Sequence, residues 1–173
     1  MRWLPLLLIG TPVSAMPQDY TPPPPTETTT ECQNGQVWDP EAETCRDPEN
    51  AAFDDATRLR AARELAQAER YDDALRVLGT IGDQEDTDVL TITGFAHRKA
   101  GRMALGLEFY DRALAADPDN LLARAYLGEA YLEAGDAAAA RAQLSEIRRR
   151  GGRQTWPEIA LRLALETGQR SSY

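Results

Sequence analysis

The sequence is poor in the residues that build catalytic and metal sites. Its 173 residues include one histidine and two cysteines. With His97 as the only histidine, no nucleophile with a histidine base beside it can be proposed. Two thiols and one histidine also cannot complete a tetrahedral zinc site. We therefore expect a protein that is not an enzyme, with no catalytic residues, no cofactor and no metal.

A long apolar run is absent as well. No stretch approaches the roughly 20 apolar residues that a membrane-spanning helix needs, so we expect no membrane span. Acidic residues outnumber basic ones 28 to 19, which gives a net charge of −9. This charge argues against nucleic acid as a partner. Lys99 is the only lysine, and such a preference for arginine indicates a GC-rich, bacterial genome.

The first 15 residues have the pattern of a secretory signal peptide. Arg2 precedes an apolar run over residues 3–9, and a small-residue ending, Val13-Ser14-Ala15, follows. We expect cleavage after Ala15, and hence a periplasmic or secreted protein. The alternatives are a buried segment or an uncleaved anchor, which the prolines in this stretch and the shortness of the run oppose.

Residues 16–31 are rich in proline and threonine and have almost no large aliphatic side chains. Such a segment cannot bury a core, so we expect a disordered, extended linker. A proline-motif ligand and a glycosylated stalk are the alternatives.

Cys32 and Cys45 bracket a short loop within residues 32–50. After export they meet an oxidising compartment, so we expect a disulfide between them. The loop also resembles the second half of a peritrophin-type chitin-binding module. The matching residues are Cys32, Gly35, Val37-Trp38-Asp39-Pro40, Cys45 and Pro48-Glu49-Asn50.

That resemblance covers a hairpin and not the sugar-holding domain, because such modules carry six cysteines. It implies a possible glycan contact at Trp38, and hence a glycan-binding envelope protein as an alternative function. A disulfide-stapled loop without a ligand is the simpler interpretation.

From residue 51 onward, alanine, leucine, arginine and glutamate dominate, and apolar residues recur three or four positions apart. This pattern predicts helix almost throughout. Glycines and one Asp-Pro pair divide the region. The expected helices span residues 54–68, 72–78, 88–99, 103–116, 121–134, 137–150 and 156–166.

Glycines recur at a spacing of 34 residues in this region, from Gly94 to Gly128 and from Gly101 to Gly135. A period of that length is typical of helix pairs that stack into a solenoid. The first unit follows the register less well, with Glu69 in place of the turn glycine. An irregular helical bundle is the alternative, but it gives no reason for the glycine register.

These units resemble the tetratricopeptide repeat (TPR). The residues that carry the resemblance are Gly94, Gly101, Tyr110, Ala113 and Pro118 in one unit, and Leu127, Gly128, Tyr131, Gly135, Ala140 and Leu144 in the next. The resemblance implies an all-α fold over residues 51–173: a short TPR-like solenoid of about three helix pairs plus a terminal helix. At each helix crossing, a glycine faces a small residue, Gly106 or Ala140, so that two backbones approach closely.

The resemblance also implies a protein-binding scaffold whose first helices line a concave groove for a peptide or a partner helix. Helical periodicity places twelve residues on that face. They are Arg60, Arg63, Gln67, Asp88, Thr91, Phe95, Arg98, Lys99, Leu122, Tyr126, Glu129 and Glu133. A peptide with a carboxylate over Arg63 and Arg98, and an apolar side chain near Phe95 and Tyr126, would fit them. The alternative is a solvated face whose arginines pair with neighbouring acids.

Residues 148–150 and Arg153 form a run of arginines before a glycine pair. A basic patch is one interpretation. We favour the other, in which arginines in a last helical turn complement the helix dipole.

Overall fold

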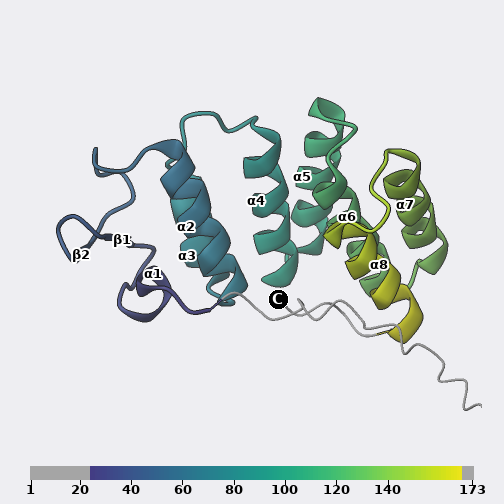
Figure 1. The fold of residues 1–173 in the computed structure, drawn as a ribbon, viewed down its shortest axis with the longest axis horizontal. Helices are drawn as coiled ribbons and strands as arrows, with labels where there is room; N and C mark the ends of the chain where they lie inside the picture. The colour runs from purple at the N-terminus through teal and green to yellow at the C-terminus, as the bar shows by residue number, and fades with distance from the viewer. Residues whose placement is uncertain (1–23, 169–173) are drawn as a thin grey trace, which may run out of the picture.

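The computed structural model describes residues 24–168, a row of helices with a small hairpin at one end (Figure 1). The expected signal peptide, residues 1–15, lies outside the described residues, as do linker residues 16–23 and residues 169–173. Between residues 24 and 168, no helix is both long and apolar enough to cross a membrane.

The expected solenoid is confirmed, with every helix boundary within one residue of its predicted position. Seven helices build it: α2 (Asp55–Gln67), α3 (Tyr71–Leu78), α4 (Thr87–Lys99), α5 (Met103–Ala116), α6 (Leu121–Glu133), α7 (Ala137–Arg149) and α8 (Trp156–Thr167). Side-chain caps define several starts: Asp54 accepts from the Thr57 amide, and Asn120 accepts from the Ala123 amide. Such caps satisfy amides that have no partner inside the helix.

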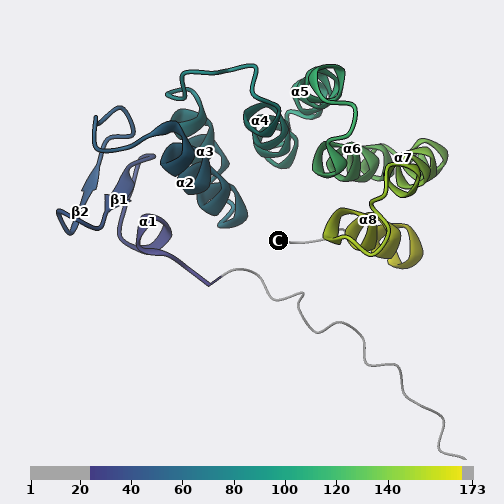
Figure 2. The same ribbon diagram turned by 45° about the horizontal axis from the view of Figure 1, so that its top comes forward.

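The helices stack as antiparallel pairs along an arc. α2 packs with α3, α4 with α5 and α6 with α7, while α8 packs against both helices of the third pair. The first helices of successive pairs also touch one another. Figure 2 shows α4, α6 and α8 along the inner side of the arc, with α5 and α7 outside them.

The first helix of each pair ends in the same left-handed turn. The turn residue has φ of +83° at Gly101, +84° at Gly135 and +61° at Glu69. In all three, the next amide bonds to a carbonyl five residues back: Arg70 to Leu65, Arg102 to His97 and Asp136 to Tyr131. The first helix pair, which has the weakest sequence match to the repeat, therefore has the same turn between its helices as the other two pairs.

At the α4–α5 crossing, two backbones are in direct contact. A β-carbon added at Gly94 would lie 2.7 Å from the Tyr110 ring and 3.0 Å from the Gly106 carbonyl oxygen. One added at Gly106 would lie 3.0 Å from the Gly94 carbonyl oxygen. A β-carbon added at Gly128 would lie nearest to the Leu161 side chain, 2.5 Å away on α8.

Gly94→Ala is therefore expected to lower the free energy of unfolding by about 1–3 kcal/mol, since α4 and α5 must separate to admit one methyl group. Gly79→Ala is the matched control, because Gly79 has φ of −63° and its added β-carbon would lie 3.5 Å from the nearest atom. The control should change stability by less than about 1 kcal/mol. Urea unfolding of both variants checks this, and equal losses would contradict a close crossing.

The end of the proline and threonine-rich segment is not extended, contrary to the prediction. Residues Glu27–Thr30 form one helical turn, α1. The Thr26 amide donates to the Thr29 hydroxyl, and the buried Thr28 hydroxyl accepts from the Trp38 amide. Thr26 also donates to Glu64 on α2, at 2.8 Å. These partners lie far along the chain, so composition alone does not reveal them.

The two cysteines form the expected disulfide, with their Cα atoms 5.5 Å apart. Strands β1 (Val37–Asp39) and β2 (Thr44–Arg46) pair antiparallel, with Trp38 opposite Cys45. Val37 is buried in the main hydrophobic core, together with residues of α2 and α3. The Arg70 guanidinium donates to the carbonyls of Thr28, Thr29 and Cys32, the last at 2.7 Å. The hairpin and α1 thus cap the amino-terminal end of the helical stack.

Candidate partner-binding groove

A hollow of about 280 Å³ opens where the first helices of the three pairs meet α8. Three or fewer residues come from each helix, so the hollow depends on the stacking of all four. Its lining consists of Arg63, Ala66 and Gln67 on α2, Ile92 and Phe95 on α4, Leu122 and Tyr126 on α6, and Trp156 on α8. The lining is apolar except at the α2 side, where Arg63 and Gln67 lie.

A row of aromatic rings runs across these helices. Tyr71 lies edge-on to Phe95 with 6.4 Å between ring centroids, Phe95 lies 4.8 Å from Tyr126, and Tyr126 lies 6.4 Å from Trp156. Phe95 and Tyr126 are only 4% and 5% exposed. These two rings therefore form the floor of the groove and also hold adjacent repeats together.

Arg98 does not present its charge to the groove as predicted. Its side chain is 1% exposed and donates to Glu133 at 2.6 Å and to Glu129 at 3.0 Å. Its Nε also lies 3.3 Å from the Tyr110 hydroxyl oxygen. Glu129 and Glu133 stand one turn apart on α6, so both carboxylates reach the same guanidinium on α4.

Electrostatics keep the Arg98 guanidinium charged. Burial by itself would lower the pKa of Arg98, but Tyr110, Glu129 and Glu133 outweigh burial and raise it. Burial is also the main reason that the pKa of Tyr110 is raised, so Tyr110 stays a neutral hydroxyl. Arg98 and Glu129 are therefore a buried link between two repeats, and a peptide carboxylate could reach Arg98 only by displacing a glutamate.

The two predicted groove arginines of α2, Arg60 and Arg63, remain at the surface. Arg63 donates to Asp88 at 2.7 Å, and both side chains are partly exposed, at 38% and 49%. The Nε of Arg63 is buried and has no hydrogen-bond acceptor within residues 24–168. Arg60 is 69% exposed and lies 3.8 Å from Glu64. The predicted pairing of arginines with neighbouring acids thus holds here, although it leaves one Arg63 donor unused.

Two further predicted groove residues have structural contacts. Thr91 is fully buried, donates to the Thr87 carbonyl and accepts from the Asn120 side chain. The Lys99 ammonium lies 5.9 Å from the centre of the Phe95 ring. Thr91 therefore connects two repeats, while Lys99 lies beside a second, more polar hollow that also includes Tyr71 and Met103.

Sequence reasoning missed three residues that line the hollow: Ala66, Ile92 and Trp156. Trp156 is the largest of them. The terminal helix was predicted, but no groove residue was assigned to it. A usable signal exists, because Trp156 follows Leu122 by 34 residues, one full repeat. α8 therefore occupies the place of a fourth first helix.

The structure shows antiparallel helix pairs, a left-handed turn within each pair and a shared inner face. Residues 97–164 match the tetratricopeptide repeat family. The match begins in α4 and ends in α8, so it covers the units with the 34-residue glycine spacing and not the first unit. No curated protein matches the chain in sequence. As a rule, TPR units are protein-binding modules rather than enzymes.

Outside the TPR-like units, Trp38 lies half-buried on β1, between the buried residues Val37 and Asp39. Asp39 pairs with Arg46 at 2.7 Å and accepts from the Glu41 amide. These contacts are those of a folded cap. A glycan contact at Trp38 stays a prediction.

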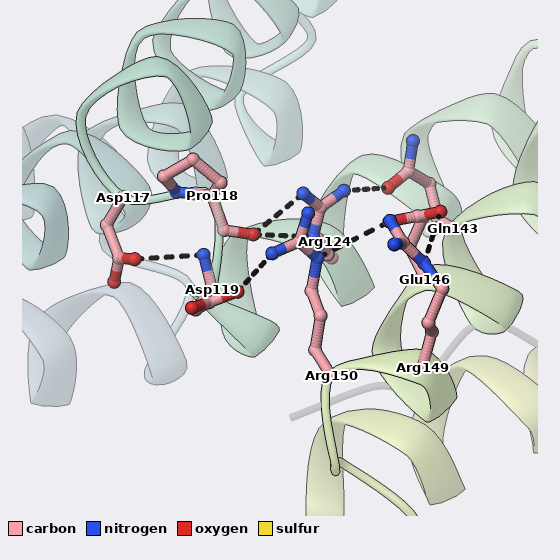
Figure 3. Close-up of polar contacts among 8 residues, drawn as sticks. All are labelled: Asp117, Pro118, Asp119, Arg124, Gln143, Glu146, Arg149 and Arg150. Carbon is pink, nitrogen blue, oxygen red and sulfur yellow. Dashed lines mark hydrogen bonds and ion pairs between the residues drawn. The ribbon is translucent and has the colours of Figure 1, made fainter.

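The arginines at the end of the last TPR-like pair form ion pairs with acidic residues of neighbouring segments (Figure 3). Arg150 pairs with Asp119 and, at 3.3 Å, with Glu146. Arg148 pairs with Glu158 on α8 at 2.6 Å. Nearby, the buried Arg124 donates to the Pro118 carbonyl at 2.7 Å. Burial and the neighbouring Arg150 lower the pKa of Arg124. Arg148 and Arg149 thus lie in the last turn of α7, as the helix-dipole interpretation expects, and Arg148 and Arg150 also pair with acids on neighbouring elements.

His97 packs against its neighbours within its TPR-like unit. Its ring stacks on Phe109 at 5.4 Å, and its Nδ1 accepts a hydrogen bond from Arg102 at 2.9 Å. Burial and the charge of Arg102 lower the pKa of His97. Within residues 24–168, no three side chains of histidine, cysteine, aspartate or glutamate are grouped to hold a metal ion.

Proposed function

We propose that this protein is a non-enzymatic interaction scaffold of the bacterial cell envelope, which binds a peptide segment or a partner helix in its concave groove. The observation that carries the proposal is the hollow formed jointly by α2, α4, α6 and α8. It has an apolar lining with polar groups on one side only. A surface of this kind suits an anchor side chain from another protein better than a substrate that must be activated.

The size of the groove favours a segment over a whole folded domain. Four helices contribute to it, and its hollow of about 280 Å³ lies just below the range of about 300–1,000 Å³ usual for small-molecule sites. An extended peptide or one amphipathic helix can place a single large side chain there, with neighbouring residues along the rims.

The envelope setting is supported by the apolar run at residues 3–9 and by the Cys32–Cys45 disulfide, which suits an oxidising compartment. Fractionation of the native bacterium by osmotic shock, followed by intact mass measurement, tests it. We expect a periplasmic or secreted protein that starts at Met16 and has its two thiols oxidised. A cytoplasmic protein that retains residues 1–15 would contradict the setting.

Crosslinking in the periplasm followed by affinity purification tests the binding function. The wild-type protein should capture a specific protein, and Leu122→Ala should reduce the captured amount at least several-fold, because Leu122 lines the hollow. Leu105→Ala is the matched control: Leu105 is 41% exposed on the outer helix α5. Equal capture by both variants would exclude this groove as the binding surface.

A further inference from the structure

We infer that the groove selects an acidic residue next to a large apolar one in the segment that it binds. This inference rests on the proposed function and adds the chemistry of the partner. It follows from the positions of Arg63 and Gln67 in the lining of the apolar hollow. Arg98 is not available to a ligand, because it is buried and paired with two glutamates of α6.

The hollow accounts for the apolar residue. Ala66, Ile92 and Leu122 line its walls together with the three aromatic residues Phe95, Tyr126 and Trp156. A large side chain, aromatic or leucine, would fill this volume and remove its apolar lining from water. A charged side chain there would have no partner apart from the α2 side, so the hollow discriminates against it.

Arg63 accounts for the acidic residue. Of its donors, Nη2 bonds to Asp88, while the buried Nε has no acceptor within the part of the chain that the structure describes. A guanidinium has five donors on a planar fork and can bind two carboxylates at different edges. A small rotation of the half-exposed Arg63 side chain toward the hollow would give its Nε an acceptor on the bound segment. Arg60, 69% exposed on the same helix, adds a second positive charge nearby.

Gln67 accounts for the acidic and the apolar residue being neighbours in the bound segment. Gln67 lines the hollow from the same helix as Arg63, one turn further along α2. One amide can both donate to and accept from a peptide main chain. A segment whose backbone pairs with Gln67 would place adjacent side chains over the hollow and over Arg63.

Fluorescence anisotropy with labelled octapeptides tests this specificity on the full mature chain. The probes carry Glu-Trp or Trp-Glu at their centre in a Gly-Ser background, with Gln-Trp, Trp-Gln and Glu-Ala as matched peptides. In one of the two orders, the acidic–aromatic peptide should bind about tenfold or more tightly than its glutamine counterpart, as expected for one charge-assisted hydrogen bond. It should exceed Glu-Ala by a similar factor.

Two variants assign these preferences. Arg63→Gln should abolish the preference for glutamate over glutamine and leave the preference for tryptophan over alanine. Leu122→Ala should weaken the preference for tryptophan over alanine and leave the preference for glutamate over glutamine. Arg141→Gln, on the exposed side of α7, is the control and should change neither.

The results separate this inference from the proposed function. If crosslinking captures a partner through Leu122 while glutamate and glutamine peptides bind equally well, the inference is wrong and the scaffold function stands. If Arg63→Gln retains the preference for glutamate, Arg63 is not its source and the inference is wrong. If crosslinking gives no capture that depends on Leu122, the proposed function itself fails.

Discussion

Replacing Arg98 with methionine is expected to lower the free energy of unfolding by about 3–5 kcal/mol. The change removes the cation between Glu129 and Glu133, whose side chains are 4% and 12% exposed. Two carboxylates would then share a poorly solvated space, at the point where α4 and α6 join. The Tyr110 hydroxyl, fully buried, would lose its donor as well. Urea unfolding followed by circular dichroism measures the loss.

Two controls show whether buried charge is the cause. Arg60→Met removes an exposed arginine of α2 and should cost less than about 1 kcal/mol. Arg98→Met combined with Glu129→Gln and Glu133→Gln leaves no buried charge and should recover part of the lost stability. If the single variant unfolds at the wild-type urea concentration, the ion pairs do not hold the two repeats together.

Removing the disulfide is the second change with a large expected effect. Cys32→Ser/Cys45→Ser should lower stability by about 2–4 kcal/mol, as loss of a short-loop crosslink typically does. The loss should be concentrated at the amino-terminal end, because Arg70 bonds to carbonyls of α1 and of Cys32 itself. When these carbonyls become mobile, the guanidinium loses three acceptors.

Hydrogen exchange locates this effect. In the double-serine variant, amides of the hairpin and of α2 and α3 should exchange faster, while those of α6 should change little, because each repeat contacts only its neighbours. A reducing agent should reproduce the change in the wild-type protein and have no effect on the variant. A uniform loss of protection across all helices would contradict a local cap.

The helices could be predicted from the sequence because their boundaries are local. Asp54 and Asn120 begin helices by accepting bonds from amides three residues on, and Gly101 and Gly135 end them with left-handed turns. Each of these signals lies within one turn of the boundary that it marks. The disulfide could be predicted for a similarly simple reason, since the chain has only two cysteines.

The site could be predicted only in part, because periodicity tells which side of a helix a residue occupies and not what packs there. Arg98 lies on the predicted face of α4, yet its partners on α6 are 31 and 35 residues away in sequence. The helical turn α1 could not be predicted for the same reason, because its threonines bond to Trp38 and Glu64, which lie at least ten residues away in sequence. Arg63, Gln67, Phe95, Leu122 and Tyr126 lie where periodicity placed them, on the lining of the hollow.

Glu69 gives the first helix pair a strained turn. It adopts φ of +61°, a conformation that the later units give to Gly101 and Gly135 and that costs other residues about 1–2 kcal/mol. The turn at Glu69 is therefore the weakest of the three left-handed turns. It lies at the amino-terminal end of the stack, and a one-dimensional stack starts to melt at its ends. The guanidinium of the next residue, Arg70, donates a hydrogen bond to the Cys32 carbonyl of the disulfide-bonded cap. The cap therefore holds the turn at Glu69 in place, and we expect the oxidised protein to lose its helical structure first at the opposite end, at α8.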